Sequence, residues 1–353
     1  MKRYRNSARY AVNIIPCLAL LITILPMTHI YASSRSKAAG IVIGVAMKTQ
    51  LQRRWKYDVQ YMQQEATTLG DTLKVVYAND DPTLQKTQVE TLLNQGIKAL
   101  IIVPVDDKVA ALLVNEAASA NVPVVSYDIL AQSPKVAYSV QRNNTLAGRL
   151  QIQAAMRAVP KGNYALLLGD MSNSVSRIMT AQWGSYLAPS VKAGKIHILL
   201  RQPVKNYDPE TALNDTEDLL SAHKDNVQAI LSLNDGMATG IIRALHERHL
   251  DGKVFVSGLD GDPANVQFIR HGTQAMTVWT RIDLQGKYAT LAADALGRRH
   301  KQPSNVTYSV DGTSIPGWQV PTIAVTARNL CYWASHIAPK GWLTPQQTRS
   351  INC

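Results

Sequence analysis

The chain has 353 residues with a net charge of +12, and 46% of its residues are hydrophobic. This length is enough for two domains of ordinary size, and the composition excludes an intrinsically disordered or fibrous protein. The basic residues do not form the Lys/Arg clusters with interleaved aromatics that nucleic-acid-binding proteins show, so we expect a solvated basic surface and no nucleic-acid partner.

Residues 1–32 predict a secretory signal peptide. The first ten residues carry four basic side chains and no acid, an apolar run of about 17 residues follows, and small residues stand at 32–33. This order is typical of an export signal that is cleaved near Ala32. Its removal would reduce the net charge to +8. The alternative is an uncleaved membrane anchor, although Asn13 and Pro16 interrupt a run that is already short for a membrane span.

Beyond residue 38, apolar segments that predict strands alternate with patterns that predict helices. The first series comprises strands at 40–47, 72–79, 99–105, 122–128 and 136–140, with helices at 54–69, 82–96 and 108–120. The second comprises helices at 144–160, 174–192, 208–223 and 235–248, strands at 163–169, 196–202, 227–235, 253–260 and 273–279, a helix at 283–300 and a strand at 305–310. Continuous apolar strands joined by helices favour parallel sheets covered on both faces, with right-handed crossovers. We therefore expect an α/β protein with two doubly wound, Rossmann-like lobes.

Polar side chains end three of the predicted strands. Asp128, Asn234 and Asp260 each follow an apolar run. Ligands of open parallel sheets bind beyond the carboxyl ends of the strands, so these side chains predict a binding cleft. The alternative is helix N-capping, a role for which Asp235 is well placed. Asp128 has no predicted helix after it, which favours the binding role.

Two arginines and a tryptophan extend this candidate site. Arg54 and Trp55 follow the first strand, and Arg177 begins the helix after the strand at 163–169. Carboxylates, amides and guanidinium groups together satisfy hydroxyls that both donate and accept hydrogen bonds, which is what a sugar presents. An indole face covers the apolar side of a sugar ring. For Arg177, a solvated position on the helix surface is an equal alternative.

The cysteines and the missing motifs limit the chemistry. Cys17 lies in the signal segment, and Cys331 and Cys353 lie in the C-terminal tail, where they form either a disulfide or two free thiols. No spacing predicts a metal site, a phosphate-binding loop or a nucleophile motif. We therefore expect no metal, no cofactor and no catalysis, although Asp128 and Asp260 could form the carboxylate pair of a glycosidase.

Several blocks together resemble the periplasmic sugar-binding proteins of ABC importers, of the ribose, galactose and xylose type, and most closely its xylose-binding branch. The resemblance covers residues 40–325 and includes RRWKYD, VPVVSYD, YDPETA, SLNDGMATG and GKVFVSGLDGDPA. It implies two Rossmann-like lobes joined by three hinge crossings: residues 38–139 with 281–308, and residues 140–280 with 309–330, followed by a tail at 331–353. The seven implied ligand-binding residues are Arg54, Trp55, Asp128, Arg177, Tyr207, Asn234 and Asp260.

The chain departs from the family pattern at several polar positions. Ile129 stands where the family commonly has arginine, and Tyr207 replaces the stacking tryptophan of the xylose binders. Ser174 or Val175 replaces an asparagine pair, Thr280 a lysine, and Lys48 and Thr49 a pair of acids. Arg177 corresponds to an arginine of the ribose and galactose binders. The resemblance thus implies a monosaccharide site whose sugar, xylose or a similar pentose or hexose, is open.

The function that the resemblance implies is that of a monomeric periplasmic receptor. Its lobes would close on a monosaccharide, and it would deliver the sugar to an ABC permease in the inner membrane. One alternative is a sensor subunit that docks, when loaded, on a chemoreceptor or a sensor kinase. Another is the effector domain of a repressor, which the export signal at 1–32 disfavours.

Overall fold

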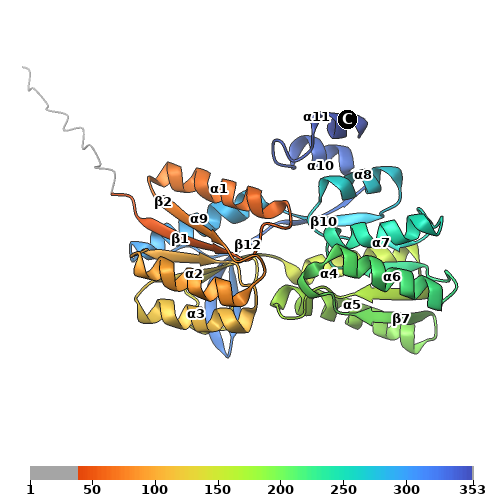
Figure 1. The fold of residues 1–353 in the computed structure, drawn as a ribbon, viewed down its shortest axis with the longest axis horizontal. Helices are drawn as coiled ribbons and strands as arrows, with labels where there is room; N and C mark the ends of the chain where they lie inside the picture. The colour runs from red at the N-terminus through yellow and green to blue at the C-terminus, as the bar shows by residue number, and fades with distance from the viewer. Residues whose placement is uncertain (1–38, 352–353) are drawn as a thin grey trace, which may run out of the picture. The chain divides into compact units, whose positions relative to one another are not determined.

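The computed structural model describes residues 39–351, and residues from Ala39 onward form one compact unit. The expected signal peptide at 1–32 and Cys353 lie outside the described residues. Two parallel α/β sheets, each with its own helices, confirm the predicted fold class (Figure 1). Within the described part of the chain, no helix has the length and apolar character to cross a membrane.

The first lobe is built on a seven-stranded sheet in the order β11-β12-β5-β4-β3-β1-β2, in which only the β11–β12 pair is antiparallel. Helices α1 and α9 pack together, as do α2 and α3. The strands are β1 (Val42–Met47), β2 (Thr72–Tyr77), β3 (Ala99–Ile102), β4 (Val124–Tyr127), β5 (Tyr138–Arg142), β11 (Val306–Val310) and β12 (Thr313–Val320). The helices are α1 (Arg54–Leu69), α2 (Pro82–Asn94), α3 (Asp107–Ser119) and α9 (Ile282–Gly297).

Strand β3 shows why the buried strands of this sheet are apolar at every position. Ala99 and Ile101 belong to the core cluster that contains Met62 of α1, whereas Leu100 and Ile102 belong to the cluster that contains Leu113 of α3. Successive side chains of a strand point to opposite faces, so a strand covered on both sides must be apolar throughout.

The second lobe contains a four-stranded parallel sheet in the order β7-β6-β8-β9 and the antiparallel pair β10–β13. Helix α4 packs on α5, and α6 packs on α7. The strands are β6 (Gly162–Leu167), β7 (Ile196–Gln202), β8 (Ala229–Ser232), β9 (Phe255–Val256), β10 (Met276–Thr280) and β13 (Thr322–Thr326). The helices are α4 (Asn144–Ala158), α5 (Ser174–Lys192), α6 (Pro209–Ala222), α7 (Asp235–Glu247) and α8 (Pro263–His271), with a 3-10 turn η1 at Lys205–Tyr207.

Three segments carry the chain between the lobes: β5 to α4, β10 to α9, and β12 to β13. One expected boundary is wrong, because residues 309–330 were placed in the second lobe. Strand β12 instead pairs with β5 in the first sheet, and only β13 joins the second lobe. Pro316, Gly317 and several exposed positions interrupt the apolar pattern of β12, so no strand was predicted there.

The C-terminal tail packs closely onto the lobes through helices α10 (Leu330–His336) and α11 (Pro345–Ser350). Trp333 and Trp342 are fully buried in a cluster with Trp279 of β10 and Val266 of α8. These two tryptophans therefore pack the tail against the body of the protein.

A pair of helical glycines tests the packing of the second lobe. A Cβ on Gly240 of α7 would lie 2.1 Å from the carbonyl oxygen of Pro209, whereas a Cβ on Gly184 of α5 would meet only the flexible end of Arg201 at 3.4 Å. We expect Gly240→Ala to lower the free energy of unfolding by about 1–3 kcal/mol through overpacking. Gly184→Ala should raise it by about 0.5–1 kcal/mol, because alanine favours the helix. Urea denaturation measures both, and equal effects would contradict the close approach of α6 and α7.

Candidate functional site

A pocket of about 410 Å³ lies between the lobes, beyond the carboxyl ends of strands from both sheets. Six of the seven predicted site residues line it, and Arg177 does not. The six are Arg54, Trp55, Asp128, Tyr207, Asn234 and Asp260. The lining residues that the sequence reasoning did not assign to the site are Lys48, Gln52, Ile129, Arg142, Val175, Leu233 and Leu259.

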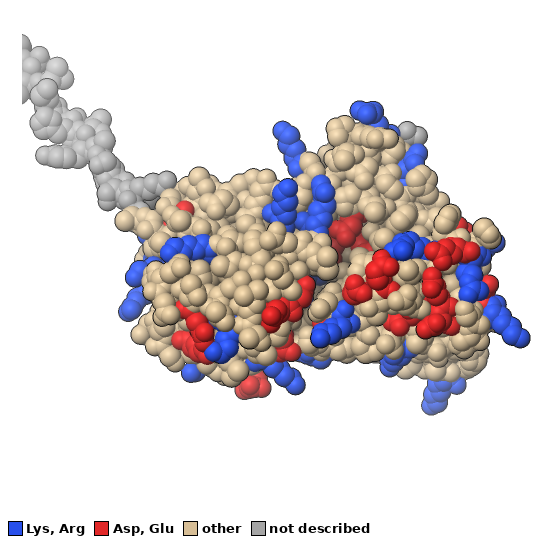
Figure 2. All heavy atoms as spheres, in the orientation of Figure 1, with Lys and Arg blue, Asp and Glu red and all other residues tan. Residues whose placement is uncertain are grey.

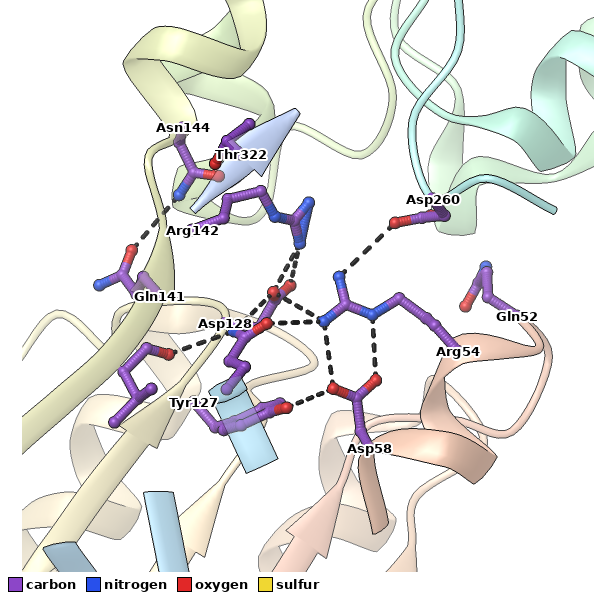
Figure 3. Close-up of polar contacts among 12 residues, drawn as sticks. Gln52, Arg54, Asp58, Tyr127, Asp128, Gln141, Arg142, Asn144, Asp260 and Thr322 are labelled. Carbon is purple, nitrogen blue, oxygen red and sulfur yellow. Dashed lines mark hydrogen bonds and ion pairs between the residues drawn. The ribbon is translucent and has the colours of Figure 1, made fainter. Parts of the chain in front are cut away.

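Arg54 lies at the centre of the polar network (Figure 3). Its guanidinium is 2% exposed and contacts Asp58 at 3.1 Å, Asp128 at 3.1 Å and, across the pocket, Asp260 at 3.5 Å. It also donates to Gln285 at 3.1 Å and lies 4.5 Å from the ring centre of Trp55. Burial acts to lower the pKa of Arg54, but the surrounding carboxylates raise it well above its ordinary value. The side chain is therefore a fixed positive charge.

Asp128 is held by two guanidinium groups. One Nη of Arg142 donates to both of its carboxylate oxygens, at 2.5 and 2.6 Å, and Gln285 donates to it at 3.0 Å. Burial acts to raise the pKa of this carboxyl, yet Arg142 and Arg54 hold it well below its usual range. The backbone at Asp128 has a φ of 62°, which ends β4 abruptly. Asp128 therefore stays ionised at pH values at which a free aspartate is already protonated.

Arg142 is the main site residue that sequence reasoning missed. It ends β5, is 3% exposed, and its Nε and Nη1 have no hydrogen-bond partner among the described residues. The family commonly has an arginine directly after Asp128, where this chain has Ile129. Here Arg142, on the neighbouring strand, supplies a guanidinium group to Asp128 instead. The strand-end rule that identified Asp128 applies equally to β5, so this signal was present in the sequence.

The second lobe supplies an amide, a phenol and a carboxylate. Asn234 is 4% exposed and caps α7 by accepting from the backbone N–H of Met237 at 3.0 Å. The Tyr207 hydroxyl lies 2.8 Å from Ser176 and 2.8 Å from the amide nitrogen of Asn173, which fixes its ring. Burial raises the pKa of Asp260, against the opposing charges of Arg54 and Arg142. Each lobe thus presents part of one polar surface.

Asp235 was expected to cap α7, but Asn234 has that role. Asp235 is fully buried and accepts from the backbone N–H of Asp262 at 2.9 Å, from Gln274 at 3.0 Å and from Thr277 at 2.9 Å. It links three segments of the second lobe. Local sequence pattern does not distinguish Asp235, which supports the lobe, from its neighbour Asn234, which lines the pocket.

Arg177 is turned away from the pocket. It donates to the buried carboxylate of Asp107 and, at 2.9 Å, to the carbonyl oxygen of Met171. Asp107 begins α3 of the first lobe, so this ion pair joins the two lobes outside the pocket. The structure therefore separates Arg177 from the other six predicted residues.

The remaining expectations concern cysteines and metals. Cys331 is exposed on α10, and its proposed partner Cys353 lies outside the described residues, so the disulfide stays a prediction. Among the residues that the structure describes, no group of three His, Cys, Asp or Glu side chains is arranged to hold a metal ion. On the face shown in Figure 2, basic and acidic side chains are interspersed over both lobes.

Asp262 adds a pH dependence next to the site. Burial and then the charge of Asp260 raise its pKa to about 7, against Arg53 and Arg54. Asp262 therefore holds its proton more firmly in the folded protein than in the unfolded chain between about pH 4 and 7, and its contribution to the free energy of unfolding should fall as pH rises through this window. We expect the free energy of unfolding, measured by urea denaturation, to decrease less between pH 5 and pH 8 in Asp262→Asn than in the parent protein. The same decrease in the variant and the parent protein would contradict the assignment.

Comparison with known proteins assigns the family. The periplasmic binding protein domain model matches residues 43–301. The chain is 31% identical over 313 residues to the D-xylose-binding periplasmic protein of Escherichia coli K12, which covers 89% of this chain and 94% of that protein. It is 31% identical over 252 residues to the ribose import binding protein RbsB of the same organism, covering 70% and 81%.

A solved structure agrees with these relatives. The carbohydrate transporter solute binding protein from Chloroflexus aurantiacus, in complex with D-glucose, superposes with a TM-score of 0.78 at 28% identity, covering 86% of this chain and 98% of that one. The matched region includes both lobes and the segments that line the pocket. The chain therefore belongs to the periplasmic sugar-binding proteins of the ribose and xylose type, a family of binding proteins and not of enzymes.

Proposed function

We propose that this protein binds one neutral monosaccharide, xylose or a similar pentose or hexose, between its lobes and delivers it to an ABC permease. The observation that carries the proposal is the pocket, in which guanidinium, carboxylate, amide and phenol groups from both lobes converge. The relatives named for D-xylose and ribose, and the neighbour with bound D-glucose, support a sugar but differ in which one.

The charges of the pocket support a neutral ligand. Each cation that lines it already contacts a carboxylate: Lys48 lies 2.7 Å from Asp80, Arg142 contacts Asp128, and Arg54 contacts Asp58 and Asp128. An anionic ligand would add a negative charge to a buried network in which every cation already has a carboxylate partner, which is costly. Hydroxyl groups can donate to Asp128 and Asp260 and accept from Arg54 and Arg142 without changing the charge.

Unpartnered nitrogens support the same ligand. Arg142 Nε and Nη1 are buried donors without a hydrogen-bond partner among the described residues, and Arg54 Nη1 has only its 3.5 Å ion pair with Asp260. Hydrogen bonds to charged groups contribute roughly 1.5–3 kcal/mol each. A micromolar dissociation constant corresponds to a binding free energy of about 8 kcal/mol. A few such bonds are enough to supply it after the entropy lost on binding is subtracted. Because each lobe holds part of the set, the sugar stabilises the closed arrangement over an open one.

The site assignment and the location belong to the same proposal. We assign ligand contacts to Arg54, Trp55, Asp128, Arg142, Tyr207, Asn234 and Asp260. Trp55 and Tyr207 supply the ring faces and the others supply the polar contacts. The basic and apolar pattern of residues 1–32 supports export to the periplasm, where the family acts and where a membrane permease can receive the sugar.

Isothermal titration calorimetry tests the proposal. The panel is D-xylose, D-ribose, L-arabinose, D-glucose and D-galactose, with D-glucuronate as the charged analogue of glucose. We expect at least one neutral sugar to bind with a micromolar or lower dissociation constant and glucuronate to bind at least about 100-fold more weakly than the best neutral sugar, because of its uncompensated charge. Binding of the sugar acid alone, or of no member of a wider monosaccharide set, would refute the assignment.

A further inference from the structure

The C-terminal tail contacts both walls of the pocket at residues next to the proposed ligand contacts. The Gly341 carbonyl accepts from the Tyr57 hydroxyl at 2.6 Å and from the Arg53 guanidinium at 3.0 Å. Arg53 directly precedes α1 and Tyr57 lies in its first turn, beside Arg54 and Trp55. The Trp342 indole N–H donates to the carbonyl oxygen of Gly261, next to Asp260, at 2.7 Å. Two consecutive tail residues therefore bind the two segments that carry opposite sides of the site.

The aromatic contacts of Trp342 also involve both lobes. The Trp342 ring lies 5.0 Å from Tyr57 of the first lobe and 5.0 Å from Trp279 of the second, with an edge-to-face geometry in both pairs. Arg53 lies 5.7 Å from the Trp342 ring centre. Aromatic pairs of this geometry and cation–π contacts are attractive beyond the area they bury. Trp342 is fully buried, so it is a fixed part of the contact between the lobes.

The tail is anchored mainly to the second lobe. Trp333 packs edge-to-face on Trp279 at 5.2 Å, and Ser350 of α11 donates to Gln267 of α8 at 2.7 Å. The two hydrogen bonds from Arg53 and Tyr57 to Gly341 are, by contrast, made by the first lobe. Figure 1 shows α10 and α11 beside α8, with α1 on the other lobe. If the lobes separate, the tail is expected to stay with the second lobe and to lose its contacts with α1.

We propose that Gly341 and Trp342 are positioning residues that hold Arg54 and Asp260 on facing walls and stabilise the closed arrangement from outside the pocket. The affinity for the ligand then depends in part on contacts between protein groups outside the pocket, which the ligand does not touch. Contacts present only in the closed arrangement shift the equilibrium toward it, and the apparent affinity rises with the population of the competent state. The effect on affinity rests on the proposed sugar-binding function, whereas the effect on lobe closure does not.

The test uses a variant that removes both donors to Gly341 and keeps the ring of Tyr57. Arg53→Met with Tyr57→Phe breaks these two hydrogen bonds between the lobes. The control, Arg248→Met with Tyr164→Phe, removes bonds of the same kind inside the second lobe, from Arg248 to Ser221 at 2.6 Å and from Tyr164 to the Val159 carbonyl at 2.5 Å. Both proteins are full-length.

We expect the dissociation constant for D-xylose, or for the neutral sugar that binds best, to rise about tenfold in the Arg53/Tyr57 variant through faster dissociation. The control should stay within about twofold of the parent protein, since its bonds do not join the lobes. Small-angle scattering of the sugar-free proteins should give a larger radius of gyration for the Arg53/Tyr57 variant alone.

Unchanged affinity and unchanged radius in that variant, or equal losses in the control, would overturn the inference. If no sugar binds the parent protein, the proposed function fails, and the scattering comparison alone decides the role of the tail. If sugars bind and the radius responds while affinity does not, the tail affects closure without positioning the site, and the inference is refuted as stated.

Discussion

Replacing Asp128 with asparagine is expected to weaken monosaccharide binding by at least about 100-fold. The carboxylate is 3% exposed and is contacted by Arg142 at 2.5 and 2.6 Å and by Arg54 at 3.1 Å. Asparagine has nearly the same shape, but it removes the charge that both guanidinium groups need and one acceptor for sugar hydroxyls. Breaking a buried ion pair from one side costs about 3–5 kcal/mol, so the free energy of unfolding should fall as well.

Calorimetry against the sugar panel and urea denaturation measure the two effects separately. Asp71→Asn is the matched control, because Asp71 is also buried and ion-paired in the first lobe, with Arg298 at 2.9 Å, but it does not line the pocket. We expect the control to lose stability and to keep its affinity within about threefold. Equal affinities in Asp128→Asn and the parent protein would show that the acceptor for the ligand lies elsewhere.

Replacing Arg54 with methionine should have the second large effect. The substitution keeps most of the side-chain volume and leaves Asp58, Asp128 and Asp260 without the cation that lies between them (Figure 3). Burial already raises the pKa of Asp58 and of Asp260, and loss of the opposing charge should raise both pKa values further. We expect sugar binding to become undetectable and the free energy of unfolding to fall by about 3–5 kcal/mol at pH 7.5.

The pH dependence identifies the cause. Carboxyls whose pKa is raised in the folded state bind protons more readily there than in the unfolded chain, so lowering the pH should restore part of the lost stability. We expect the deficit of Arg54→Met relative to the parent protein to be smaller at pH 5 than at pH 7.5. Arg298→Met, which removes a more exposed pair in the same lobe, should show a smaller deficit. A pH-independent deficit for Arg54→Met would indicate lost packing instead of unbalanced charge.

Local sequence pattern was enough to predict the fold class and most of the pocket wall. Strands covered on both faces must be apolar throughout, and polar side chains at their carboxyl ends have no core to face, so Asp128, Asn234 and Asp260 were found from a local pattern. Arg54 and Trp55 were found from their place after the first strand, the resemblance added Tyr207, and all six line one pocket. Arg142 obeys the same strand-end rule and could have been included.

The direction in which each polar side chain turns, and the lobe that each C-terminal segment joins, could not be predicted from local pattern. Arg177 begins its helix next to the pocket, yet it pairs with Asp107 of the other lobe, and Asp235 supports the second lobe while its neighbour Asn234 lines the site. Strand β12 joins the first sheet and β13 the second, and Trp342 meets Tyr57 from a position far away in the chain. Sequence periodicity fixes which residues are buried along one element. The partner that a long charged or aromatic side chain finds depends on which distant segments lie within its reach, and that is set only when the lobes pack.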